Sequence, residues 1–497
     1  MARPVQLATQ SRFPDRSRRY GRPRSAARRS RSLATSGAAG MQRFAWQLPA
    51  LISLLAGLTG LSASARAETR PRYGGRLTVE IHDAITFTDP AAWPPQLVAL
   101  VYDRLVTVDE RGEPHPALAA SWQHDPDNKR WEFRLRPGVK FHDGSPLNAA
   151  AAAACLKGWT SVTAADEDVV VVQTENPAPD LPARLAGPGN VILRRGADGV
   201  TTGSGPFRIA EWQPGRRALL TANDDYWGGR PYLDDIELQM GHSPRDQAVD
   251  LELGKADLVE LTPDDARRAA QRGARTCVSA PAELLTLVFQ RGHTAVEDAR
   301  LRQAVALSID RAAIHNVLLL KQGESTGAVL PGWLTGYAFL FPAARDLDRA
   351  RQMVASLPKS GTRITPSITL GRITLSYDAA DPLARPIAER IALNAREAGV
   401  VIQVAAGGPL DLRLARIPLR SLDPEQALAA YASAFGMTAT FKAPTVPSPE
   451  ARFEAEQKLL EDGRVVPLFH VPQIMGLGPR VRNWNPEPWG DWRLADV

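Results

Sequence analysis

The residues of this sequence that could do chemistry are few and stand in no catalytic pattern. His142 directly precedes Asp143, the kind of pair that can pass a proton, and Arg302 and Arg311 could clamp an anion. A lone histidine beside a turn is more often a structural hydrogen-bonding partner than a base. No nucleophile and base recur at a useful spacing, no metal-ligand cluster stands out, and G-x-S-x-G, H-E-x-x-H and Walker patterns are missing. The sequence predicts a protein that is not an enzyme and holds no cofactor or metal.

Two cysteines, Cys155 and Cys277, are the other reactive side chains. An oxidising compartment would permit a disulfide between them. They lie far apart in the sequence, and Cys155 belongs to an alanine-rich stretch with high helix propensity. We therefore expect two buried thiols.

The stretch 203–238 is a run of turns and strands that could position a site. Gly203, Gly205 and Pro206 open it with turn-forming residues. Strands are expected at 206–212, 217–222 and 233–240, the first two forming a hairpin around the turn at 213–215.

Strands and helices alternate through the rest of the chain. Asn148 is a candidate N-cap for the helix that follows it. A strand, a helix and a second strand over 373–404 predict a right-handed crossover and a parallel pair, and thus an α/β protein. Further strands are expected at 76–81, 105–109, 130–135, 169–174, 191–194, 256–259, 284–289 and 465–470, and helices at 93–106, 116–122, 149–154, 180–185, 245–253, 264–272, 298–308, 311–320, 383–398 and 450–461.

The positive charge of the chain is confined to its N-terminal part. The 497 residues carry a formal charge of +6, yet residues 1–67 hold twelve arginines and a single acidic residue, Asp15. The remaining residues are acidic, with a charge of about −5, so a nucleic acid partner is not expected.

The N-terminal part divides into two segments. Residues 1–40 are rich in Arg, Ser, Ala and Pro and predict a disordered extension, or a translation start placed too far upstream. Residues 41–67 read as a signal peptide, with Arg43, an apolar run at 48–61 and Ala65-Arg66-Ala67 before the expected cleavage. A retained membrane helix is the alternative, but the run is short for a span and broken by Ser, Gly and Thr.

Three stretches together resemble one family. The stretch 203–238 follows the pattern G-T-G-P-F, strand, basic turn, strand, N-x-x-Y-W-x-G-x-P-x-L-D, with Ser204 in place of Thr. The block 100–147 contains L-V-Y-D-x-L, P-x-L-A-x-S-W and W-x-F-x-L-R-P-G-V-K-F-H-D-G-x-P-L. The string D-A-R-L-R-Q-A-V-A-L-S-I-D-R-A-A-I begins at Asp298. The sequence thereby resembles the extracytoplasmic solute-binding proteins of family 5, the peptide- and nickel-type receptors of ABC importers, in which Arg302 and Arg311 would stand in structural positions.

The resemblance implies a fold, a location and partners. The fold would be α/β, a large, type II-like, two-lobed periplasmic binding protein with mixed sheets and a hinge between its lobes. Residues 68–240 would form the first part of lobe I, with a reduced subdomain near 160–202, 241–460 would form lobe II, and 461–497 would return to lobe I. The protein would be a periplasmic monomer that passes a small molecule or short peptide to an ABC permease and its ATPases. A sensory or docking receptor without import, or a secreted enzyme, are the alternatives.

The resemblance also suggests residues that would contact a ligand. By analogy in position these are four aromatic residues and one carboxylate: Phe87, Trp93, Trp333, Tyr337 and Asp423. Many family members carry W-x-x-D-Y-x-D-P at the cleft, with an acidic residue that holds a peptide amine. Here the segment 412–428 keeps Asp423 and its following proline but lacks the tryptophan and earlier aspartate, and three arginines stand in it, Arg413, Arg416 and Arg420.

Overall fold

The computed structural model describes residues 73–109, 113–156, 159, 161–196, 199–293, 296–357, 373–407, 411–438, 448–482, 484–486 and 491–497. The predicted extension at 1–40 and signal peptide at 41–67 lie outside these ranges. None of the helices in the described ranges has the length and apolar character that a bilayer crossing requires.

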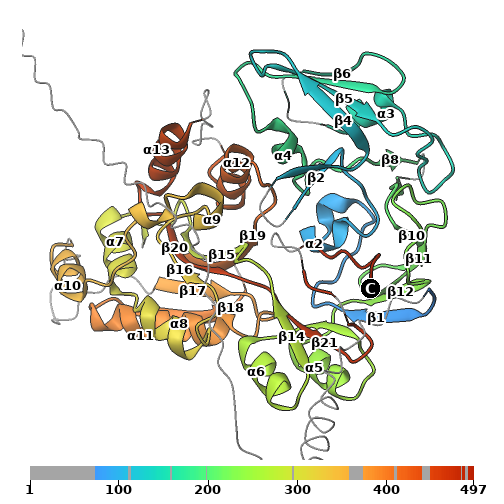
Figure 1. The fold of residues 1–497 in the computed structure, drawn as a ribbon. Helices are drawn as coiled ribbons and strands as arrows, with labels where there is room; N and C mark the ends of the chain where they lie inside the picture. The colour runs from blue at the N-terminus through green and yellow to red at the C-terminus, as the bar shows by residue number, and fades with distance from the viewer. Residues whose placement is uncertain are drawn as a thin grey trace, which may run out of the picture. The chain divides into compact units, whose positions relative to one another are not determined.

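A seven-stranded mixed sheet forms the base of the first lobe (Figure 1). Strand β1 lies between β12 and β13 and is parallel to both, while the hairpin β10–β11 continues the sheet beyond β12. The predicted strand at 217–222 is confirmed to the residue. The strands are, in spatial order, β10 (Phe207–Gln213), β11 (Arg217–Ala222), β12 (Asp235–Gln239), β1 (Arg76–Glu80), β13 (Leu258–Glu260), β21 (Ile474–Leu477) and β14 (Arg275–Val278), with helices α5 (Pro244–Glu252) and α6 (Pro263–Gln271) beside them.

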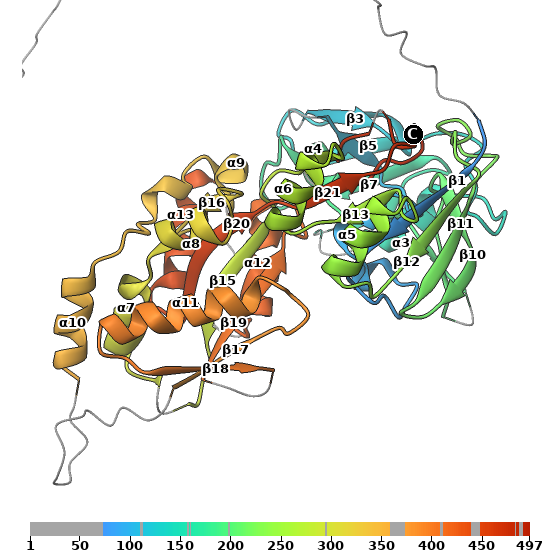
Figure 2. The same ribbon diagram turned by 90° about the horizontal axis from the view of Figure 1, so that it is seen from below.

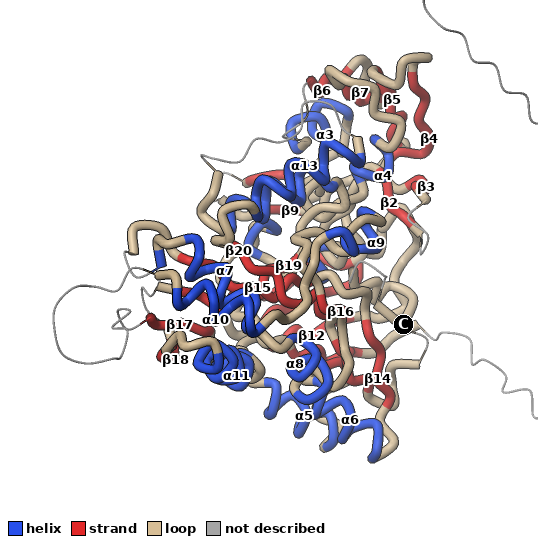
Figure 3. The backbone as a smooth tube through the Cα atoms, turned by 90° about the vertical axis from the view of Figure 1, so that its left-hand side faces the viewer, coloured by secondary structure: helices blue, strands red, loops and turns tan. Residues whose placement is uncertain are grey.

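A second mixed sheet, of six strands, forms the other lobe. Strands β17 and β18 are parallel and joined through α11, which confirms the predicted strand-helix-strand unit, and α11 packs along both strands (Figures 2 and 3). The strands are β16 (Glu324–Ser325), β20 (Val465–Val471), β15 (Glu283–Phe289), β19 (Leu412–Pro418), β17 (Ile373–Tyr377) and β18 (Ile402–Ala406). The helices are α7 (Ala299–Ser308), α8 (Arg311–Val317), α9 (Gly332–Thr335), η3 (Ala338–Leu340), α10 (Leu347–Ala355), α11 (Ala384–Glu397), α12 (Pro424–Ala434) and α13 (Pro449–Leu460).

A four-stranded sheet with its own apolar core is a subdomain of the first lobe. Trp131, Phe133 and Leu135 alternate inward from the middle of it, as the sequence pattern predicts. Asn148 caps α3 by accepting a hydrogen bond from the Ala151 amide. The elements are β4 (Ala119–His124), β5 (Arg130–Leu135), β7 (Val169–Gln173), β6 (Ser161–Ala164), α3 (Ala149–Cys155) and α4 (Leu181–Leu185), with η1 (Pro90–Ala92), α2 (Pro95–Val98) and the pairs β2–β3 (Val106–Val108, Pro114–Pro116) and β8–β9 (Arg194–Arg195, Thr201–Thr202) nearby.

Two predicted helices are wrong. The helix expected at 93–106 is limited to the single turn α2, because the carbonyls of Leu100 and Val101 accept hydrogen bonds from Phe207 and Gly205 instead of continuing a helix. The helix expected at 116–122 is largely the strand β4, which pairs with β5 along its length. In both places long-range pairing outweighs the local helix propensity.

The sheets divide the chain at other places than the predicted boundaries of 241 and 461. Strands β13 and β14 belong to the first sheet, and β20 still belongs to the second. Within the described ranges the chain passes between the two sheets twice, from β14 to β15 and from β20 to β21. The two passages are joined, since the Ser279 amide donates to the Gln473 carbonyl at 3.0 Å and the Gln473 amide donates to the Ser279 hydroxyl at 3.0 Å. We call this double crossing the hinge, and the parts built on the two sheets lobe I and lobe II.

The glycine-containing turn Gly203-Ser204-Gly205 lies directly against the chain at Val101. A Cβ atom built on Gly203 would be 2.0 Å from the Val101 carbonyl oxygen, and one on Gly205 would be 2.6 Å from the Val101 carbonyl carbon. The Gly205 amide donates to that same oxygen at 3.0 Å. Because the obstructing atoms are backbone, a side chain at either position would push the two segments apart.

A buried carboxylate fastens the same turn to the loop that follows β11. Asp103 accepts hydrogen bonds from the Ser204 hydroxyl, the Tyr226 hydroxyl and the Trp227 indole at 3.0, 3.1 and 2.9 Å. Burial raises the pKa of Asp103 to about 6, although these three donors each lower it. The residues of the sequence pattern thus meet at one carboxylate, and their role is structural.

We predict that Gly205→Ala destabilises the protein by about 1–3 kcal/mol, because the added methyl group overpacks against the Val101 backbone. Urea denaturation followed by circular dichroism measures the change. Gly332→Ala is the control, since its Cβ would make only an ordinary contact at 3.6 Å, and it should lie within about 0.5 kcal/mol of the parent. Equal stability of the two variants would contradict the close approach seen at Gly205.

Candidate functional site

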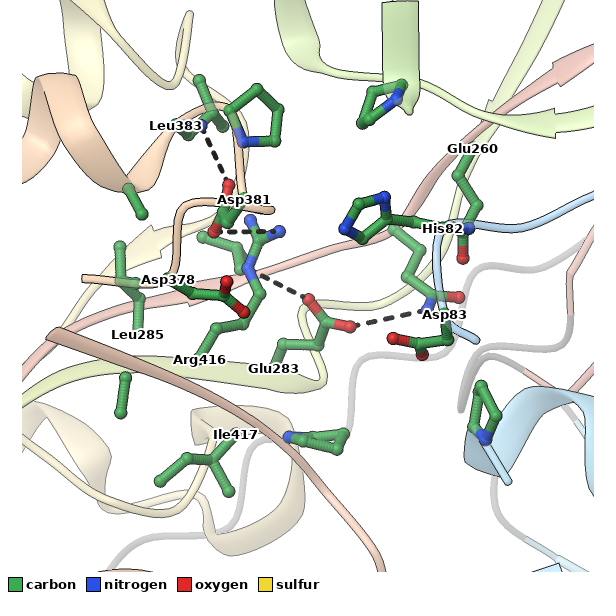
Figure 4. A pocket seen from close by; sticks show the side chains of 18 of the residues that line it. His82, Asp83, Glu260, Glu283, Leu285, Asp378, Asp381, Leu383, Arg416 and Ile417 are labelled. Carbon is green, nitrogen blue, oxygen red and sulfur yellow. Dashed lines mark hydrogen bonds and ion pairs between the residues drawn. The ribbon is translucent and has the colours of Figure 1, made fainter. Parts of the chain in front are cut away.

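A pocket of about 1000 Å³ lies between the lobes and is lined by both (Figure 4). From lobe I, His82 and Asp83 follow β1, and Glu260 ends β13. From lobe II, Asp378 follows β17 and Arg416 points in from β19. The carboxyl ends of parallel strands β1, β13 and β17 therefore converge on the pocket, the position at which open α/β sheets place their ligands.

Arg416 is held in the pocket by two carboxylates of lobe II. Its Nε lies 3.4 Å from Glu283 Oε2, and its Nη1 lies 3.6 Å from Asp381 Oδ2. Asp381 also accepts the Leu383 amide at 2.9 Å, which fixes it at the start of α11. Burial raises the pKa of Glu283, while Arg416 lowers it. The carboxylates of Glu283 and Asp381 are therefore already paired with a cation, the Arg416 guanidinium.

Glu260 presents a half-buried carboxylate from lobe I. Its Oε2 accepts the His82 amide at 2.8 Å, and its own amide donates to Gln247 Oε1 at 2.8 Å. Burial, together with the charges of Asp83 and Glu283, raises the pKa of Glu260 to about 7. This group would hold its proton near neutrality until a cation approaches.

Carboxylates outnumber guanidinium groups in the pocket. Among the described residues that line it are five acidic and three arginine side chains. Arg413 and Arg420 each donate to a backbone carbonyl, of Ala434 and Ala91 respectively. The pocket has the electrostatic character of a site for a positively charged group. The acidic side chains are Asp83, Glu260, Glu283, Asp378 and Asp381, and the arginines are Arg413, Arg416 and Arg420.

Of the predicted aromatic contacts, Trp93 lines this pocket. Its ring is fully buried, stacks on Trp212 with centroids 5.7 Å apart and donates its indole hydrogen to the Phe87 carbonyl at 2.9 Å. The Phe87 side chain itself is 67% exposed and stands outside the described lining. Contact of either residue with a ligand stays a prediction.

The two predicted aromatic residues of lobe II lie outside the described lining of the pocket. Trp333 donates its indole hydrogen to the Pro281 carbonyl at 3.1 Å. Tyr337 is buried edge-on against Phe453, with centroids 5.8 Å apart. The structure therefore does not bring the four predicted aromatic residues together, and their contact with a ligand also stays a prediction.

Asp423 joins the lobes rather than lining the pocket. Its side chain is fully buried and caps α12 by accepting from the Glu425 amide at 2.9 Å. The Arg184 guanidinium, on α4 of lobe I, contacts the other oxygen through Nη2 at 2.6 Å and Nε at 2.8 Å. Burial raises the pKa of Asp423 in spite of this partner. We call the Arg184–Asp423 pair the interlobe ion pair; its carboxylate already has a cationic partner.

The reactive side chains singled out in the sequence have structural partners. The His142 ring donates from Nε2 to the Gly205 carbonyl at 3.0 Å. Arg302 donates to the Asp462 carbonyl, and Arg311 donates to the Pro467 carbonyl. These contacts confirm structural positions for all three side chains.

Cys155 ends helix α3 and Cys277 lies in strand β14, and no disulfide joins these described residues. Cys155 donates to the Leu193 carbonyl at 2.9 Å. Both side chains are half-buried rather than buried as predicted, and burial raises the pKa of the Cys277 thiol to about 11.

Comparisons with known proteins agree with this architecture. A family model described as "Bacterial extracellular solute-binding proteins, family 5 Middle" matches residues 113–417. The nickel-binding periplasmic protein of Escherichia coli (strain K12) is 26% identical over 353 residues, 63% of this chain and 67% of that one. The probable D,D-dipeptide-binding periplasmic protein DdpA of the same strain is 25% identical over 341 residues, 61% of this chain and 64% of that one, somewhat under two thirds of its length.

A solved structure shares the fold. The dipeptide-binding protein from Pseudoalteromonas sp. SM9913, in complex with Met-Leu, superposes with a TM-score of 0.70 at 16% identity, covering 85% of this chain and 99% of that one. At this identity the likeness establishes the fold alone.

We predict that Arg184→Met weakens the contact between the lobes. The substitution leaves Asp423 buried without its partner, which costs about 3–5 kcal/mol unless the lobes part and water reaches the carboxylate. Small-angle scattering of the unliganded variant should therefore show a larger radius of gyration. Arg134→Met is the control, because Arg134 and Asp168 form an exposed pair within lobe I. An unchanged radius of gyration for Arg184→Met would rule out a role of the interlobe ion pair in holding the lobes together.

Proposed function

Because the chain belongs to the bacterial extracellular solute-binding proteins of family 5, we propose that it is the substrate-binding component of an ABC importer. It captures a small solute between its lobes and delivers it to a membrane permease driven by ATPases. The observation that carries this proposal is the pocket of about 1000 Å³ between two sheets that are joined by the hinge. A site enclosed by two lobes can retain a ligand when the lobes close and release it when they open.

The finer parts of the proposal concern location and partners. The protein acts in the periplasm after cleavage behind Ala67, as a monomer, without nucleic acid and without chemistry on its ligand. Relatives named for nickel and for a D,D-dipeptide support a small cargo. A short peptide or a related compound fits the volume of the pocket.

The charge of the pocket narrows the class of solute. Five carboxylates against three guanidinium groups among the described lining residues favour a solute with an amine or another cationic group. The charges of Asp83 and Glu283 raise the pKa of Glu260, and the charge of Asp83 also raises the pKa of Glu283, so a cation placed among the three carboxylates would be favoured. Arg416 opposes a second cation on the Asp381 side, which places the proposed cationic group toward lobe I.

Native mass spectrometry of the protein freshly isolated from the periplasm tests the proposal. A co-purified molecule small enough for the pocket and carrying a cationic group is the expected result. A product altered relative to the added solute would instead indicate an enzyme.

Deletion of the protein, followed by measurement of solute import, tests the link to a permease. Loss of import, with normal binding in vitro, would link capture to a permease, and normal import would favour a sensory receptor.

We predict that affinity for a cationic solute rises as the pH increases from 6 to 8. Glu260, with its pKa raised to about 7, must lose its proton before it can pair with the cation, so the dissociation constant should fall by about tenfold over this range and level off above it. Isothermal calorimetry at several pH values measures the change. Glu260→Gln should flatten the profile, whereas Glu454→Gln, at an exposed position on α13, should keep it. A profile that falls with pH would contradict a cationic ligand at Glu260.

We predict that the ligand both stabilises and compacts the protein. A ligand that binds only the closed form stabilises the folded protein by about 2.7 kcal/mol at a hundred times its dissociation constant, and its preference for the closed form drives closure. Thermal melting and small-angle scattering on one sample measure both effects. A thermal shift with an unchanged radius of gyration would contradict closure about the hinge while leaving the fold unaffected.

A further inference from the structure

Glu80 meets His242 and Asp250, two residues far from it in the sequence, in lobe I and outside the described lining of the pocket. Glu80 ends β1, His242 follows β12, and Asp250 lies on α5. One ligand atom from each lies within 4.8 Å of the others, and His242 Nδ1 is 3.6 Å from Glu80 Oε2. Their separation in sequence explains why sequence reasoning predicted no metal-ligand cluster.

Glu80 supplies independent evidence that this cluster needs a ligand. The residue is 2% exposed, and its Oε2 has no hydrogen-bond partner among the described residues. A buried carboxylate oxygen left without a partner is costly, and native proteins normally provide one or an ion. A cation placed between the carboxylates would give this oxygen a partner.

We propose that Glu80, His242 and Asp250 form a site for a resident divalent transition-metal ion, of which zinc is the best match. One imidazole nitrogen and two carboxylate oxygens are a ligand set that zinc accepts, and three protein ligands leave a fourth position for water. Magnesium and calcium prefer sets made of oxygen alone. The site goes beyond solute capture, because the ion would be a fixed part of lobe I and not the cargo.

The surroundings of His242 favour this role. Its backbone carbonyl accepts from the His82 ring at 3.1 Å and from Gln247 Nε2 at 3.1 Å, so the loop that carries the imidazole is fixed from two sides. Lys255 Nζ lies 3.2 Å from one oxygen of Asp250. A carboxylate has two oxygens, so Asp250 can contact the lysine and an ion at once, and the lysine side chain is exposed.

The ion would also fix one wall of the pocket. Glu80 is separated from His82 by one residue, and His82 and Asp83 line the pocket. A metal that links the end of β1 to α5 therefore restrains the segment that presents Asp83 to a solute.

Zinc titration of the full chain, stripped with a chelator and dialysed, tests the proposal by isothermal calorimetry. We expect one zinc ion per chain with a dissociation constant in the micromolar range or below. His242→Ala and Asp250→Asn should each weaken binding by at least about tenfold. Asp381→Asn, which changes a carboxylate of the pocket, is the matched control and should leave zinc affinity unchanged.

Three results would overturn the proposal. The first is that the parent chain binds no zinc at millimolar concentration. The second is that His242→Ala keeps the zinc affinity of the parent chain. The third is that only Asp381→Asn loses zinc affinity, which would place the ion in the pocket. Circular dichroism verifies that the variants are folded. X-ray absorption of the zinc-loaded parent chain needs no variant: one imidazole ligand supports the site, and an all-oxygen shell refutes it. Failure here would leave solute capture between the lobes untouched.

Discussion

The hinge is the constraint on which the rest of the structure depends. Each sheet has its own apolar core, so the lobes are related by the pair of passages tied through Ser279 and Gln473 and by the interlobe ion pair. These passages also carry part of the site, because Gln473 and Glu283 both line the pocket. A rotation at the hinge therefore moves Glu283 and its partner Arg416 relative to Glu260. Movement of the lobes therefore also changes the arrangement of charges that a solute meets in the pocket.

Local patterns in the sequence predicted most helices and strands of the fold. The strand at 130–135, the capped helix after Asn148 and the parallel unit around α11 all have strong local signals and form as expected. The exceptions are segments whose backbone partners lie far away. The chain after Trp93 is held by Gly205 and Phe207, and β4 is held by β5. A prediction based on neighbouring residues has no access to those partners.

The site was much less predictable than the fold. Its carboxylates come from segments around positions 83, 260, 283 and 381, and each of them alone resembles an ordinary surface acid. One signal was present, since Arg416 stands in the segment where the family pattern places other residues, and it lies in the pocket. Asp423 kept its place in that pattern, yet here it pairs with Arg184. Position in a pattern therefore identified the region of the site but not the chemistry of each side chain.

The order of strands in the first sheet has a consequence for how the chain can fold as it leaves the ribosome, amino end first. All six strands of lobe II lie between Glu283 and Val471, so that sheet can complete while the C-terminal segment is still being synthesised. Lobe I has to wait, because β21 fills the place between β13 and β14. Until residue 477 emerges, two strand edges in lobe I lack their neighbour, and open edges of this kind invite pairing with other chains. The interval before the last strand docks is therefore when lobe I is most exposed to pairing with other chains.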